Sequence, residues 1–235
     1  MYCQLRAEDF GLNHVSFFSH QGSNVVVYSH FCGTVGELPE GFKGYPMFPG
    51  IDPEVLKGRS FKTMAIDIHE VLDGKIKKTW HFEDWLTALE QLLAKQEFTY
   101  LERPILLEEG ESMTKIYGQP PQAFCSLTEF IVPDFTFERR ATLLFGNRIT
   151  IMFKLSGTIT NIEGFPELPM FPGIPSEKLL GKKFDMRAID IQIIRDGKVK
   201  QEYHIEDWAA ALNQILNGYP PSDFGLDEEF LKPST

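Results

Sequence analysis

Apolar and polar side chains alternate over parts of residues 61–71 and 184–194, which is the period of a half-buried β-strand. An Asp-Gly pair follows each of these segments, and Asp-Gly favours the two-residue turn of a β-hairpin. Residues 76–82 and 199–205 are therefore predicted to return as antiparallel partner strands. The pattern predicts one hairpin of this kind in each half of the chain.

A second pair of strands is predicted earlier in each half. Residues 24–28 and 148–153 are rich in β-branched and aromatic side chains, and a Gly-Ser or Gly-Asn pair precedes each of them as a turn. Residues 36–58 and 160–181, which follow, are rich in proline and glycine and are predicted to be loops. The turn before residues 24–28 and the turn before residues 148–153 each imply a hairpin with an earlier strand. Each half is thus predicted to contain four antiparallel strands.

A short amphipathic helix is predicted to close each half. Asp84 and Asp207 stand at the two helix starts, where a carboxylate can accept hydrogen bonds from free backbone amides. A weaker helical pattern over residues 106–117 predicts a further helix between the halves. The apolar faces of the two main helices consist of Trp85, Leu89, Leu92 and Leu93, and of Trp208, Leu212, Ile215 and Leu216.

The two halves are copies of one sequence. Residues 45–93 match residues 168–216 at a constant offset of 123, with 26 identities in 49 positions. A period of this length suits two copies of one small domain. We therefore predict a first repeat over residues 1–97, and a linker plus a second repeat over residues 98–235.

Charge and composition narrow the classes of partner. The 235 residues carry a formal net charge of −10 with no cluster of lysine or arginine, which argues against nucleic acid and an anionic membrane surface. No signal peptide and no apolar run of about 18 residues occurs, so the protein is predicted to be soluble and cytoplasmic. Its three cysteines lack the spacing of a zinc site or a disulfide framework. No metal and no cofactor is predicted, because no motif for either is present.

The order of short motifs is the same in both repeats. It runs Gly-Thr, a loop rich in glycine and proline, Ile-Asp-Ile, Asp-Gly-Lys and Glu-Asp-Trp before the helix. Over about residues 9–94 and 134–217 this order resembles the SnoaL-like polyketide cyclase branch of the nuclear-transport-factor-2-like superfamily. The resemblance implies an α+β fold of two tandem cystatin-like half-cones, each a curved antiparallel sheet with a C-terminal helix.

The chain departs from that family at its beginning. Family members start with helices that close the mouth of the cone, and here the first predicted strand lies only a few residues after Met1. We therefore expect the two sheets, the linker or the tail at residues 219–235 to cover one another, because a curved apolar sheet face does not stay in water. The repeats would then form an internal pseudo-dimer, with a homo-oligomer as a further alternative. A natural start upstream of Met1 is another explanation.

The resemblance also implies a function, a cofactor-free cyclase, isomerase or hydrolase acting on an apolar, ring-containing small molecule. Asp84 and Asp207 match the aspartate that serves as general acid/base in these cyclases, and burial would raise the pKa of such a carboxyl. Helix capping explains the same two residues without catalysis. His69 would assist Asp84 in the first repeat only, since its counterpart is Gln192.

Other repeated polar residues are expected to be structural. His81 and His204 recur beside the turn into the helix and are expected to be hydrogen-bonded donors rather than bases. Asp67 and Asp190 alternate with isoleucines, and they face either the cone interior or, as we expect, the solvent.

Aromatic side chains are the candidates for binding the ligand. They are Trp80, Trp85, Tyr203, Trp208, Phe48 and Phe171. The last two belong to the identical Pro-Met-Phe-Pro-Gly-Ile loops at residues 46–51 and 169–174, which form either a lid or, as we expect, a contact between the repeats. The competing class of function is a non-catalytic module, in which two mutually packed half-cones hold a hydrophobic ligand or a protein partner.

Overall fold

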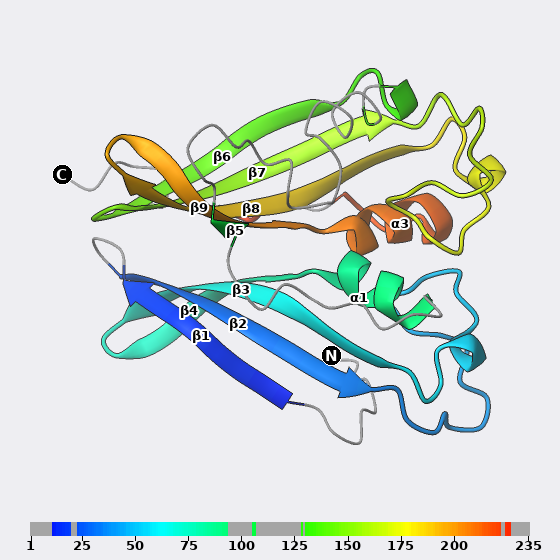
Figure 1. Cartoon of the computed structure of the whole chain (residues 1–235), viewed down its shortest axis with the longest axis horizontal. Coiled ribbons are helices and arrows are strands. Elements are labelled where there is room, and N and C mark those ends of the chain that lie inside the picture. Colours follow the sequence, from blue (N-terminus) through cyan, green and yellow to red (C-terminus); the bar gives the residue numbers. More distant parts are fainter. Residues whose placement is uncertain are drawn as a thin grey trace.

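A computed structural model describes residues 11–19, 23–93, 105–106, 128, 130–221 and 224–226. It contains two antiparallel sheets, each followed by one helix, so the predicted α+β class is confirmed (Figure 1). The first repeat consists of β1 (Gly11–Ser19), β2 (Asn24–Thr34), β3 (Ser60–Leu72), β4 (Lys75–Glu83) and α1 (Trp85–Leu93), and its strands lie in the order β1-β2-β3-β4.

The second repeat has the same order of strands and adds one. The short strand β5 (Ile105–Leu106) pairs with the edge of its last strand, giving the order β5-β9-β8-β7-β6. The prediction of a helix over residues 106–117 is therefore wrong at Leu106, and its remainder lies outside the described residues. The other elements are β6 (Thr136–Phe145), β7 (Arg148–Thr158), β8 (Lys183–Arg195), β9 (Lys198–Glu206) and α3 (Trp208–Asn217).

Single turns of 3-10 helix interrupt the two glycine- and proline-rich loops. They are η1 (Pro53–Val55) and η3 (Ser176–Lys178). No helix among the described residues is long and apolar enough to cross a membrane.

The two faces of each sheet have different neighbours. In β3, Ile66 and Ile68 point to the face that packs against the other repeat, and Phe61 and Ala65 point to the face on which α1 packs. We call these the contact face and the helix face. The contact faces bury Val26, Tyr28, Ile66, Ile68, Trp80 and Phe82 of the first repeat against Ala141, Met152, Ile189, Ile191 and Ile205 of the second.

The C-terminal tail completes this contact. Phe224 is buried, its ring centroid lies 5.9 Å from that of Phe82, and its carbonyl accepts a hydrogen bond from Trp80 Nε1 at 2.7 Å. The tail of the second repeat thus covers the first, as one of our alternatives predicted. The contact faces are kept from water by each other and by the tail.

The two identical loops also join the repeats, which confirms their predicted role as a contact. A Cβ atom added to Gly50 would lie 2.9 Å from Ile174 Cδ1, and one added to Gly173 would lie 2.7 Å from Ile51 Cδ1. Asn213 of α3 donates a hydrogen bond to the carbonyl of Pro46 at 2.7 Å. Helices α1 and α3 lie next to each other beside these loops (Figure 1).

Candidate acid–base site

A pair of β-bulges brings the repeated aspartates and histidines together. In β3 the register shifts between Glu70 and Val71, and beyond the shift Asp67 lies opposite His81 of β4. The equivalent register shift between Ile193 and Ile194, with Lys200 as the extra residue of β9, places Asp190 opposite His204 of β9. Directly opposed residues share a face, so both pairs lie on the helix face, in the row just beyond the helix.

In each repeat the histidine lies between two carboxylates. His81 Nδ1 lies 2.6 Å from Asp67 Oδ1, and His81 Nε2 lies 3.1 Å from Glu83 Oε1. Trp85 Nε1 then donates to Glu83 Oε2 at 2.8 Å. This chain of contacts links the sheet to the start of α1.

The second repeat reproduces the arrangement with more burial. His204 Nδ1 contacts Asp190 Oδ1, His204 Nε2 lies 3.4 Å from Glu206 Oε1, and Trp208 Nε1 donates to Glu206 Oε2 at 2.8 Å. The side chains of His204 and Asp190 are 12% and 10% exposed, against 40% and 20% for His81 and Asp67. The expectation that these aspartates face solvent is wrong, because each one pairs with its histidine.

His81 is a poor base in this setting. Burial lowers the pKa of His81, but its hydrogen bonds with Asp67 and Glu83 outweigh burial and raise the pKa to about 10. At neutral pH the imidazole of His81 is therefore protonated and cannot accept a proton. This agrees with the structural role expected for the histidine.

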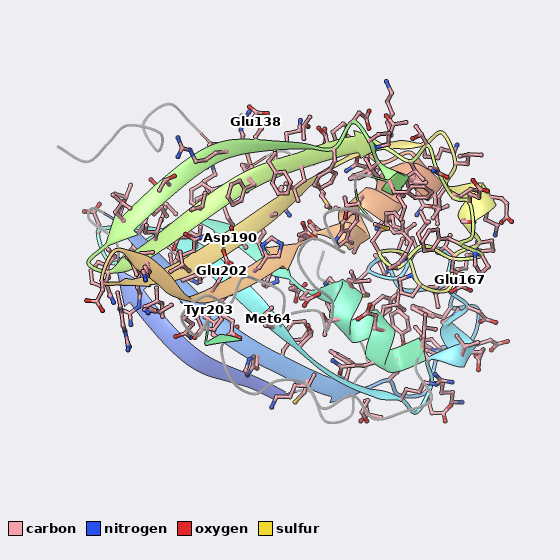
Figure 2. The ribbon with its side chains drawn as sticks, turned by 45° about the horizontal axis from the view of Figure 1, so that its top comes forward. Met64, Glu138, Glu167, Asp190, Glu202 and Tyr203 are labelled. Atoms are coloured by element: carbon pink, nitrogen blue, oxygen red, sulfur yellow. The ribbon has the colours of Figure 1, made fainter. Side chains whose placement is uncertain are left out.

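The next opposed pair on the helix face, two residues farther along the strands, distinguishes the two repeats. In the second repeat Gln192 Nε2 donates to Glu202 Oε1 at 2.7 Å, and in the first His69 Nδ1 lies 2.9 Å from Thr79 Oγ1. Glu202 is 5% exposed and lies one row from Asp190 (Figure 2). Burial raises the pKa of Glu202, and the charge of Asp190 raises it further, against the opposing effect of the Gln192 hydrogen bond.

Apolar side chains of the neighbouring strand β7 lie beside these polar residues on the helix face. Ile151 lies opposite Asp190, Ile149 opposite Gln192, and Phe153 opposite Ala188. The ring of Phe137 on β6 has its centroid 6.3 Å from that of Phe153, and the residue is 63% exposed. The second repeat thus combines an apolar wall on β6 and β7 with a polar row on β8 and β9.

Asp84 and Asp207 occupy the helix starts, where the sequence placed them. Asp84 Oδ1 accepts from the backbone N–H of Thr87 at 3.0 Å, and Asp207 Oδ1 accepts from that of Ala210 at 3.1 Å. Both are helix caps by geometry. Their predicted role as acid/base groups stays a prediction.

The two caps differ in their partners. Asp207 Oδ2 lies 3.2 Å from Arg187 Nη2, and the Arg187 guanidinium lies over the Phe82 ring of the other repeat at 5.3 Å. Met64 stands at the position equivalent to Arg187, so it supplies Asp84 with no cation. Burial raises the pKa of Asp84 despite the opposing hydrogen bonds from Thr87.

The structure does not bring His69 and Asp84 together. The Asp84 N–H donates to the carbonyl of Met64, and His69 lies five residues farther along β3. At a strand rise of about 3.3 Å per residue, this places the two residues about 16 Å apart along the strand. They cannot form the acid/base pair that the sequence suggested.

The aromatic side chains predicted to bind ligand pack against other rings. Phe48 and Trp85 have ring centroids 5.5 Å apart, and Phe171 and Trp208 have centroids 5.4 Å apart, in the core beneath each helix. Trp80 lies on the buried contact face, and the Tyr203 ring lies 4.3 Å from that of Tyr28 of the other repeat. Each therefore has a packing role in the described structure.

Sequence reasoning missed Glu202, which no repeated motif marks. The only available signal was the difference between the copies, a glutamate where the first repeat has Thr79. Within the part of the chain that the structure describes, no group of three His, Cys, Asp or Glu side chains could hold a metal ion.

Comparisons with known proteins complete the description. No protein-family model matches the chain, and no curated protein matches it. Among solved structures, AclR from Streptomyces galilaeus, a proposed hydroxylase, aligns at 14% identity and a TM-score of 0.33, covering 45% of this chain and 62% of its own. IdmH from Streptomyces antibioticus, a proposed polyketide cyclase, aligns at 23% identity and a TM-score of 0.32, covering 42% of this chain and 66% of its own. TsrD from Streptomyces laurentii aligns at 22% identity and a TM-score of 0.34, covering 50% of this chain and 73% of its own. The chain thus spans less than two thirds of the first two solved chains that it matches.

Proposed function

We propose that the protein is a cofactor-free acid–base enzyme of the SnoaL-like type, acting on a ring-containing small molecule at the helix face of the second repeat. The observation that carries the proposal is Glu202, a buried carboxyl whose pKa is raised. A carboxyl in that state exchanges protons closer to neutral pH than an ordinary glutamate does. The apolar wall of β6 and β7 would hold the ring beside it.

The neighbouring residues have supporting roles in this proposal. Gln192 orients Glu202 through its hydrogen bond. Asp190 raises the pKa of Glu202, and His204 holds Asp190 in place. The first repeat has Thr79 at the position of Glu202, so it would serve as the structural partner rather than as a second active centre.

A proton-exchange assay tests this function without a known substrate. Enzymes that close or isomerise rings by acid–base chemistry remove a proton from carbon next to a carbonyl, so we would incubate cyclic and aryl ketones in heavy water and follow deuterium uptake by NMR. Wild type is expected to accelerate uptake into at least one ketone, and Glu202→Gln to slow it by about 10²-fold or more. Glu138→Gln is the matched control, because Glu138 is exposed and lies on the face of the sheet opposite to that of Glu202.

The variant Asp84→Asn separates this site from the one that the sequence suggested. If Asp84→Asn abolishes uptake and Glu202→Gln does not, the reaction belongs to the helix cap of the first repeat. Circular dichroism of every variant shows whether a loss of exchange follows from a loss of fold.

The non-catalytic module is the second candidate, and a specific observation favours it. Both capping aspartates bond to their own helix amides, and the contact faces of the repeats bury each other. A folded wild-type protein that exchanges no proton in any ketone would support the module and contradict the enzyme.

A further inference from the structure

Asn217 and Gly218 form an Asn-Gly pair at the end of α3, and the sequence holds no other. The amide carbon of an asparagine side chain is open to attack by the backbone nitrogen of the next residue. A following glycine hinders that attack least, because it has no Cβ. Both residues are exposed to solvent. The pair therefore has the chemistry and the access that spontaneous deamidation requires.

The closed end of the helix restrains this reaction. Gly218 has a φ of +67°, and its N–H donates to the carbonyl of Gln214 at 3.1 Å, so the attacking nitrogen is held in a hydrogen bond. The last turn of α3 must open before the nitrogen can react. Helix ends open at low cost, and residues 219–221, which follow, are exposed and so contribute little packing.

The amide group of Asn217 also begins a chain of contacts between the repeats. Its Nδ2 donates to Asn213 Oδ1 at 2.9 Å. Asn213 is buried, and its own Nδ2 donates to the carbonyl of Pro46 in the first repeat at 2.7 Å and to that of Ala209 at 3.0 Å. An exposed, reactive side chain is thus joined through one buried residue to a loop of the other repeat.

We propose that Asn217 is a site of spontaneous deamidation, and that its product loosens the contact between the repeats. The Gly218 nitrogen bonds to Asn217 Cγ and gives up its proton, while the C–N bond of the side-chain amide breaks and ammonia leaves. The cyclic succinimide then takes up a water molecule, which opens it at either carbonyl to give aspartate or isoaspartate. Water is the co-reactant, and the reaction needs no oxidant or reductant.

Both products remove the donor that orients Asn213. A carboxylate at position 217 cannot donate to Asn213 Oδ1, and its negative charge at the C-terminal end of α3 is opposed by the helix dipole. Isoaspartate also lengthens the backbone by a methylene group, which displaces the Gly218 N–H from Gln214. Asn213 is then held less firmly, and its hydrogen bond to Pro46 weakens.

The first repeat is the internal contrast. At the repeat offset of 123, the Asn-Gly pair is replaced by Ala94 and Lys95, and Asn213 is replaced by Glu90. The modification is therefore expected in the second repeat alone.

Ageing the folded protein tests the site. Wild type and a synthetic peptide of residues 214–220 are incubated in the same mildly alkaline buffer, and mass spectrometry of proteolytic fragments follows every asparagine. Asn217 is expected to deamidate faster than any other asparagine of the protein. It should react about tenfold or more slowly than in the peptide, because the closed turn protects it. Urea well below the unfolding midpoint should narrow that difference.

Asn217→Asp reproduces one product and tests the link to the first repeat. The amides of Phe48 and Ile51, which form hydrogen bonds within the loop after Pro46, report on that loop through hydrogen exchange measured by NMR. Asn217→Asp is expected to speed their exchange by about fivefold. Asn147→Asp adds the same charge at the exposed turn between β6 and β7, and as the matched control it is expected to leave that exchange unchanged.

Two results would overturn the inference. One is deamidation of Asn217 that is no faster in the folded protein than that of the other asparagines, a comparison that needs no variant. The other is unchanged exchange of the Phe48 and Ile51 amides in folded Asn217→Asp. Neither measurement involves Glu202, so both outcomes are independent of the proposed acid–base function.

Discussion

His81 and His204 show how single side chains hold each sheet to its helix. Each imidazole lies between a carboxylate on the neighbouring strand and one that accepts from the first tryptophan of the helix. For His81 the hydrogen bonds with Asp67 and Glu83 raise the pKa to about 10, so its imidazolium form is the stable one at neutral pH. The contribution of such a group to stability depends on pH.

His81→Gln tests this dependence. The folded pKa of His81, about 10, lies above the ordinary value of 6.5, so its contribution is fully present below about pH 6.5 and is lost as pH rises through 10. The difference in the free energy of unfolding between wild type and His81→Gln should therefore shrink steadily from about pH 6 to above pH 10. Urea unfolding across that range measures it. Asp67→Asn should reduce the slope as well, and a difference that stays constant with pH would show that His81 is not held as a cation.

At the scale of elements, the hydrophobic pattern predicted the hairpins but not the site within them. Asp73 and Gly74 form the turn, both with positive φ, as the Asp-Gly pair indicated. If β3 and β4 paired without interruption from the two-residue turn, Asp67 would lie opposite Trp80 and would have no ion pair. The bulge at Lys77 of β4, opposite the step from Glu70 to Val71, shifts the register by one residue, and a shift of one residue exchanges the faces. No local sequence signal marks that bulge, so the Asp–His rows were not predictable.

A glutamine side chain in each helix joins the helix to its sheet. Where β4 ends, α1 runs beside β3, and the Gln91 side chain pairs with the Lys62 backbone, accepting from its N–H and donating to its carbonyl at 2.8 Å each. Gln214 pairs with the Asp185 backbone in the same way. The side-chain amide takes the place of the missing strand, and this explains why the glutamine occurs in both helices.

Gln91→Ala should therefore cost more than an ordinary helix substitution. It leaves a donor and an acceptor of the Lys62 backbone without their partners, and we expect a loss of about 1–3 kcal/mol in the free energy of unfolding, measured with urea. Gln91→Glu keeps the acceptor and loses the donor, so it should fall between wild type and alanine. A loss within about 0.5 kcal/mol for alanine, as at an ordinary surface site, would mean that water replaces the amide.

At the scale of the whole molecule, the sequence predicted that the repeats contact each other but not which surfaces they use. The identical loops indicated a contact, and it is present. The pairing of contact faces, by contrast, depends on which side of each sheet the helix occupies. That choice follows from packing of residues distant in sequence, such as Phe224 against Phe82, which periodicity does not reveal.

The close approach of the loops gives a test of the assembly with a control in the same loop. Gly50 has a φ of +80° and Gly58 a φ of +71°, so alanine is strained by about 1–2 kcal/mol at either position. Around Gly58 an added Cβ meets nothing within 4 Å, whereas at Gly50 it meets Ile174 Cδ1 and Leu216 Cδ1 of the other repeat, both at 2.9 Å. Gly50→Ala should therefore lower the free energy of unfolding by about 1–3 kcal/mol more than Gly58→Ala does. Equal losses in urea unfolding would show that the isoleucine and leucine ends move aside freely, and that this contact does not hold the repeats together.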